Sequence, residues 1–166
     1  LSAPSWGTQQ APASHVAGSM AVFAVGHLAV AWNEELVFRG YGQKTLALAL
    51  GRPLADAVLV TLFALFHPLK PLTLVGEAAL GLALLSLRDQ RDDIWLPIGY
   101  HWAWNTLQTA VFGPSDGPPS LRPLVVHGPA AWVGRPGHPE PGYLSTLVNL
   151  SVAVGAFLWS RRKHLS

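Results

Sequence analysis

Apolar residues are concentrated in five long stretches of the chain, with glycine, proline and charged residues between them. The stretches cover residues 16–50, 54–67, 72–87, 96–112 and 143–159. A helix that spans a bilayer needs about 20 mainly apolar residues, since each residue adds about 1.5 Å to its length. The pattern therefore predicts an all-α protein, a polytopic membrane bundle of five apolar helices.

The first stretch is too long for a single spanning helix, and several others are short. For residues 16–50 we expect either a break near residues 40–42 or an extension of one helix beyond the membrane. Pro53 favours a helix start, whereas Pro68 and Pro71 end the second stretch. Because several stretches fall below about 20 residues, short, broken and re-entrant helices remain open.

The connectors indicate how the bundle lies in the membrane. Residues 113–142 are rich in proline and glycine and lack periodicity, which predicts an extramembrane loop. If each stretch crosses once, basic residues divide six to three between the two sides. The six are Arg52, Arg88, Arg91, Arg161, Arg162 and Lys163, and the three are Lys70, Arg122 and Arg135. The positive-inside rule then predicts that the basic tail, residues 161–166, is cytoplasmic.

Composition supports a membrane protein and excludes other classes. Hydrophobic residues make up 50% of the chain and charged residues 12%, about half the share found in soluble domains. The seven Trp residues suit the headgroup level of a bilayer. The basic residues form no continuous face that could bind phosphates, so we expect no nucleic-acid partner. The absence of Cys excludes disulfides and a thiol nucleophile.

The chain is interpreted as a single membrane-embedded domain over residues 1–166. It begins at Leu1, without Met and without the charged start and cleavage site of a signal peptide. We therefore expect it to be part of a longer protein, truncated at its N-terminus.

Ionisable side chains inside apolar helices cost roughly 2.5 kcal/mol or more each, so each one suggests a function. Glu35 and Arg39 lie four residues apart and can pair on one helix face. Glu34 points away from that face by a quarter of a turn or more. A Glu and an Arg at this spacing are most often a structural ion pair.

Two further groups have the same helical spacing. Phe63 and His67 are one turn apart near the end of the second stretch, and His101 and Asn105 are one turn apart in the fourth. Singly, each group has a structural explanation as a helix cap or a hydrogen bond between helices. One shared site explains all three groups together, and it is therefore the interpretation that we favour.

The three motifs Glu-Glu-x-x-x-Arg, Phe-x-x-x-His and His-x-x-x-Asn, in this order, resemble those of the CAAX protease and bacteriocin-processing family, also called Abi. The motif residues are Glu34, Glu35, Arg39, Phe63, His67, His101 and Asn105. The resemblance implies an intramembrane glutamic endopeptidase similar to the type II CAAX prenyl endopeptidases. Family members have a core of about eight spanning helices, so the five stretches resemble its C-terminal catalytic part. The segment Phe38-Arg39-Gly40 resembles that of bacterial members of the family. This resemblance implies that the protein is located in a bacterial cytoplasmic membrane.

The resemblance also implies roles for these residues. Glu34 would be the general base that activates a water, and His67 would hold and polarise the same water. Glu35 and Arg39 would brace the site through their ion pair. His101 and Asn105 would donate hydrogen bonds to the oxyanion, a contribution of roughly 3 kcal/mol per donor in known hydrolases.

Trp102 and Trp104 follow His101, and we expect them to pack or to line the substrate groove. His27 and Glu77 also lie within apolar stretches and are weaker candidates for the site. His127 and His138 fall in the loop of residues 113–142 and are expected to be exposed.

No cofactor is expected, with zinc as the less favoured alternative. Glu and His are zinc ligands, but the zincin motif His-Glu-x-x-His is absent from the sequence. The sequence also lacks Gly-x-Ser-Gly and Gly-x-Gly-Asp motifs, which argues against a serine nucleophile and an aspartyl dyad. The expected partners are the lipid bilayer and a peptide or protein substrate, either prenylated or otherwise membrane-associated.

Two other functions remain open from the sequence. Intramembrane Glu and His residues also mark proton- or ion-coupled transporters, although no internal repeat is present. A non-catalytic membrane scaffold or a bacteriocin-immunity protein is the third hypothesis. A shared site requires His67 and His101 to approach each other. In a simple up-and-down bundle they would lie toward opposite faces, so we expect helices that end within the bilayer.

Overall fold

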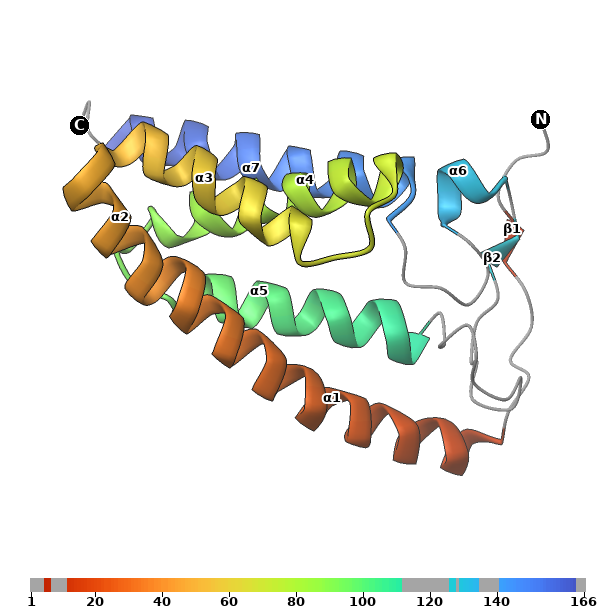
Figure 1. Ribbon diagram of the computed structural model, residues 1–166. Helices are drawn as coiled ribbons and strands as arrows, with labels where there is room; N and C mark the ends of the chain where they lie inside the picture. Colours follow the sequence, from red (N-terminus) through yellow and green to blue (C-terminus); the bar gives the residue numbers. More distant parts are fainter. Residues whose placement is uncertain (1–4, 7–11, 112–125, 128, 135–140, 164–166) are drawn as a thin grey trace.

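The computed structural model describes residues 5–6, 12–111, 126–127, 129–134 and 141–163. The described residues are mostly helical, which confirms the all-α prediction (Figure 1). The helices are α1 (Ala13–Glu35), η1 (Leu36–Gly42), α2 (Gln43–Leu50), α3 (Arg52–Leu65), α4 (Pro71–Arg88), α5 (Trp95–Thr106), η2 (Leu107–Val111), α6 (Ala130–Val133) and α7 (Tyr143–Lys163). The strands are β1 (Ser5–Trp6) and β2 (Val126–His127).

The first apolar stretch forms one continuous helix of 38 residues, made of α1, η1 and α2. Of the two alternatives, the break near residues 40–42 is wrong. The helix instead widens into π-turns at η1, where Gly42 lies close to α3. A Cβ atom at Gly42 would lie 2.7 Å from the backbone oxygen of Val37 and 3.2 Å from a methyl carbon of Leu59. The first distance lies within the π-turn itself and the second is to α3, so glycine here fits a tight turn and close packing of α3 rather than ending the helix.

Helix α3 is short because glycine and proline mark its start and prolines follow its end. Gly51 has φ +76°, a conformation that glycine adopts readily, and Pro53 lies in the first turn. The helix has 14 residues, about 21 Å at 1.5 Å per residue, which is less than the bilayer core. His67 follows its end and therefore lies within the depth of the bundle, as the shared site requires.

Figure 1 shows α3, α4 and α7 together on one side of the bundle and α1 on the other, with α5 between them, while α2 continues α1 toward the start of α3, against which it packs. Helix α4 packs against α3, α5 and α7, and α1 packs against α5. A small apolar core joins η1, α3 and α4, and consists of Phe38, Leu59, Phe63, Leu80 and Leu84. This core supports the polar cluster described below.

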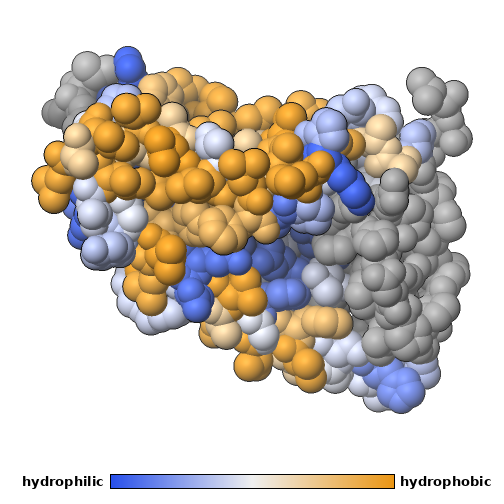
Figure 2. All heavy atoms as spheres, viewed as in Figure 1, coloured by the Kyte–Doolittle hydropathy of each residue, from blue (hydrophilic) through white to orange (hydrophobic). Residues whose placement is uncertain are grey.

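Much of the face of the bundle seen in Figure 2 is apolar. Large side chains are exposed along the bundle, such as Val25 at 73%, Leu48 at 91% and Leu69 at 72%. Among the described residues, three helices are long and apolar enough to cross a membrane, namely Ala13–Leu50, Pro71–Arg88 and Tyr143–Arg162. Exposing these apolar side chains to water would cost free energy, whereas exposing them to the lipid of a bilayer is favourable.

Charged residues gather where α2 meets α3 and where α4 ends. Arg52 contacts Asp56 at 2.8 Å and also contacts Asp89, and Arg88 contacts Asp92 at 2.8 Å. Partial burial opposes the charge on Arg52, but hydrogen bonds to the two carboxylates outweigh it and raise the pKa of the guanidinium above its ordinary value. Helix α7 ends at this same side of the bundle (Figure 1).

The predicted loop over residues 113–142 contains short elements where the structure describes it. Strand β2 pairs antiparallel with β1, with Ser5 opposite His127, and α6 is a single turn of helix. The prediction of a plain loop was therefore incomplete, because a two-residue ladder and one turn leave no periodic signal in a sequence. His138 lies outside the described residues.

Candidate active site

Glu35 and Arg39 form a buried ion pair at the junction of α1 and η1. Arg39 Nη1 donates to Glu35 Oε1 at 3.0 Å, and the two side chains are 1% and 0% exposed. Arg39 Nη2 also donates to the backbone oxygen of Gly81 on α4 at 3.2 Å. The pairing expected from their spacing is therefore present, and it ties the end of α1 to α4.

The Arg39 guanidinium lies over the ring of Phe63, 4.5 Å from the ring centre. A Cβ atom on Gly81 would lie 3.5 Å from Arg39 Nη2 and 3.4 Å from the Phe63 ring, so the helices are closely packed here. A cation over an aromatic face gains about 0.5–2 kcal/mol. The Phe63 side chain therefore packs against the charged cluster and takes no part in its hydrogen bonds.

His101 is buried, with 2% of its surface exposed, and Glu35 fixes its orientation. His101 Nδ1 lies 2.9 Å from Glu35 Oε1. Because an ionised carboxylate can only accept a hydrogen bond, Nδ1 carries the hydrogen in this contact. The other ring nitrogen, Nε2, then faces Glu34 Oε2 at 3.8 Å. That separation is too long for a direct hydrogen bond but suits groups that share a water.

Glu34 differs from its neighbour in exposure. Its side chain is 34% exposed, whereas that of Glu35 is completely buried. One residue along a helix turns the side chain by about 100°, which directs Glu35 into the bundle and Glu34 toward the opening. Glu34 is therefore the carboxylate of this pair that a water or a substrate can reach.

His67 lies beside the same cluster and is oriented by the backbone. His67 Nδ1 lies 2.9 Å from the carbonyl oxygen of Phe63, which can only accept, so Nδ1 donates. The centre of its ring lies 5.2 Å from the centre of the Phe63 ring. The centres of the Phe63 and His101 rings are 5.9 Å apart. Phe63 is thus a common neighbour of both histidines.

The structure brings together five of the predicted site residues, Glu34, Glu35, Arg39, His67 and His101. Asn105 is half-buried and lies one turn beyond His101 on α5. The contacts that join the other five do not include it, so its place at the site rests on that spacing.

The two tryptophans make packing contacts. Trp102 Nε1 donates to the backbone oxygen of Ala24 at 2.7 Å, which ties α5 to α1. Trp104 stacks on Tyr100 with 6.1 Å between ring centres and packs against the apolar core. Contact between either tryptophan and a substrate stays a prediction.

Two weaker candidates lie close to the cluster. Glu77 on α4 is 8% exposed, and its Oε2 atom lies 3.6 Å from His67 Nε2. His27 on α1 stacks on Phe23, and its Nδ1 atom is buried without a hydrogen-bond partner. In the sequence, each of the two is a single ionisable residue in an apolar stretch. Neither has a second ionisable residue one helical turn away that would have indicated its role.

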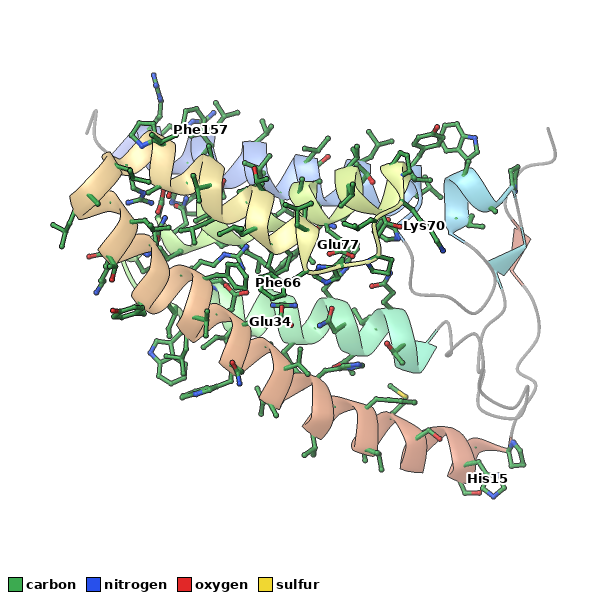
Figure 3. All side chains as sticks on the ribbon, viewed as in Figure 1. His15, Glu34, Phe66, Lys70, Glu77 and Phe157 are labelled. Carbon is green, nitrogen blue, oxygen red and sulfur yellow. The ribbon has the colours of Figure 1, made fainter. Side chains whose placement is uncertain are left out.

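The site opens to the surface in a polar recess. Figure 2 shows polar side chains gathered in a hollow between the α3–α4 layer and α5, with apolar surface around it. In the same view, Figure 3 labels Glu34 and Glu77 in this region, with Phe66 beside them. Within the described residues, no group of three or more His, Asp or Glu side chains has the arrangement of a metal site. The expectation of a metal-free site stays a prediction.

The fold and this cluster define a helical membrane protein with a buried Glu–Arg–His centre. Residues 16–107, more than half of the chain, match the family model described as type II CAAX prenyl endopeptidase Rce1-like. The chain belongs to this family, which confirms the resemblance found in its motifs, and all three motifs lie inside the matched region. It is accordingly an integral membrane protein of a protease family. No significant match was found among curated proteins or solved structures.

Proposed function

We propose that this chain is an intramembrane endopeptidase in which Glu34 activates a water for attack on a peptide bond. The observation that carries the proposal is the contrast between the two adjacent glutamates. Glu35 is buried and holds Arg39 and His101, whereas Glu34 is partly exposed and faces the free nitrogen of His101 at 3.8 Å. One carboxylate therefore orients the site and the other is available for chemistry.

The water would lie between Glu34 and the histidines. Glu34 takes one proton from it as the oxygen attacks the carbonyl carbon of the substrate. The carbonyl oxygen becomes an oxyanion. When the C–N bond breaks, Glu34 returns the proton to the leaving amine, so the carboxylate is regenerated. His67 would hold the same water from the side of α3.

His101 and Asn105 would stabilise the oxyanion by donating hydrogen bonds to it. For His101, this requires a particular protonation state of the ring. Because Nδ1 already donates to Glu35, His101 Nε2 can donate only when the ring carries a second proton. The Asn105 amide needs no such change. The oxyanion would therefore accept a hydrogen bond from His101 only when the imidazole is protonated, and from the Asn105 amide in either state of the imidazole.

The surroundings of the site favour a substrate with an apolar group. Phe66 and Leu69 flank His67 and are 79% and 72% exposed. The family name refers to prenylated CAAX substrates. We infer that this chain cleaves membrane-associated peptides, prenylated or otherwise lipid-modified, in a bacterial cytoplasmic membrane, with its basic tail on the cytoplasmic side.

The test is cleavage of a prenylated peptide and of its unlipidated counterpart by the protein in liposomes. We expect cleavage of the prenylated peptide by the wild type and its loss in Glu34→Gln. Asp93→Asn removes a carboxylate that caps the Trp95 backbone at 3.0 Å, away from the site, and should keep the activity. Equal cleavage by Glu34→Gln and the wild type would contradict the proposal, and ion flux without cleavage would favour a transporter.

A further inference from the structure

Glu77 is a third carboxylate at the site, and the water-activating mechanism does not use it. It lies midway along α4, an 18-residue apolar helix, and is 8% exposed. A charged residue in such a helix costs roughly 2.5 kcal/mol or more unless a partner offsets the cost. The partner that it faces is His67, which comes from a different element.

The contacts of His67 leave one nitrogen for Glu77. Nδ1 donates to the Phe63 carbonyl at 2.9 Å, so the backbone sets the position of the ring and of that hydrogen. Nε2 faces Glu77 Oε2 at 3.6 Å, too far for a direct hydrogen bond but close enough for the carboxylate to attract this edge of the ring. Glu77 also interacts electrostatically with His101 and Glu34, so it borders the same centre.

The two histidines are therefore held in parallel ways. Each has Nδ1 tied to an acceptor, Phe63 for His67 and Glu35 for His101, and each directs Nε2 toward a further carboxylate. In this arrangement the Glu34 carboxylate faces Nε2 of His101, and the Glu77 carboxylate faces Nε2 of His67. Glu77 and Glu34 reach the centre from opposite sides of the bundle, α4 and α1.

We propose that Glu77 is a positioning residue for His67: its carboxylate attracts the Nε2 edge of the ring without bonding to it directly at 3.6 Å, so Nε2 stays free to contact the attacking water. This inference rests on the proposed function, because it needs His67 at the reaction. In this proposal Glu77 contacts neither the water nor the substrate, and its main effect on the reaction passes through His67.

A double-mutant cycle in liposomes tests this inference, with kcat and KM measured for Glu77→Gln, His67→Ala and the double variant. Glu77→Gln keeps the size of the side chain, and we expect it to lower kcat by at least about tenfold with KM little changed. In the His67→Ala background the same change should have no further effect, because residues that act as a unit are not additive. Thr73→Val, on the same helix one turn earlier and also buried, is the matched control and should keep the activity.

The outcomes separate this inference from the proposed function. Wild-type kcat in Glu77→Gln would overturn the role of Glu77, and so would a loss of kcat that is equally large with and without His67. Neither result would contradict the proposed peptidase activity. Full activity of His67→Ala would instead contradict the proposed function itself. Glu77→Asp, which keeps the charge, should recover part of the lost kcat if the protein is folded, and thermal unfolding in detergent checks that it is.

Discussion

Removing one partner of the buried Glu35–Arg39 pair should destabilise the protein far more than removing one partner of an exposed pair at the same spacing. Replacing Arg39 by Met removes its bonds to Glu35 at 3.0 Å and to the Gly81 carbonyl at 3.2 Å. Glu35 is completely buried, and its Oε2 atom already lacks a hydrogen-bond partner. Breaking one side of a buried pair costs about 3–5 kcal/mol, because the other charge stays buried without compensation.

The assay is unfolding of the purified protein in detergent, followed by tryptophan fluorescence. We expect Arg39→Met to be destabilised by about 3–5 kcal/mol, and the double variant Glu35→Gln/Arg39→Met to lose about 1–3 kcal/mol less than the sum of the two single changes. Arg52→Met is the matched control, since Arg52 pairs with Asp56 four residues away but is 41% exposed, and its loss should stay within about 1 kcal/mol. Equal losses at Arg39 and Arg52, or strictly additive losses in the double variant, would refute the reasoning.

Two further predictions concern the oxyanion and the membrane. Asn105→Ala should lower kcat by about a hundredfold with KM largely kept, because its amide acts on charge that exists in the transition state; a change in KM alone, measured by steady-state kinetics, would argue against that role. The protein should stay in the membrane fraction after washing with high salt or alkaline carbonate and leave it only with detergent, given its three span-length apolar helices, and release into the carbonate wash would contradict membrane insertion.

Most of the helices were predictable because prolines and apolar runs mark their ends. The third stretch, predicted over residues 72–87, is the helix Pro71–Arg88, and the second, predicted over 54–67, is Arg52–Leu65. The continuity of the first helix through Gly40 and Gly42 was not predictable. Gly42 fits the π-turn beside the Val37 carbonyl and packs against Leu59 of α3, and a glycine signal in the sequence reveals neither contact.

The site was predictable where its residues lie at helical spacing. The Glu35–Arg39 pair follows from the spacing alone, and the approach of His67 to His101 follows once α3 is seen to be short. The contact of Glu77 with His67 joins two helices that the sequence does not align with each other. A single glutamate in an apolar helix indicates a functional residue but does not identify its partner.

The most direct test of the central claim is the turnover of a prenylated peptide by purified Glu34→Gln in liposomes, beside the wild type and in the presence of a chelator. If Glu34 is the base, kcat should fall by at least 10²–10⁴-fold, the range that one general base contributes, while the variant still folds and binds the peptide. The wild type should keep its activity in EDTA or phenanthroline and contain no stoichiometric zinc. Wild-type turnover by Glu34→Gln would contradict the account, and complete inhibition of the wild type that added zinc reverses would replace the metal-free glutamate mechanism by a zinc-dependent one.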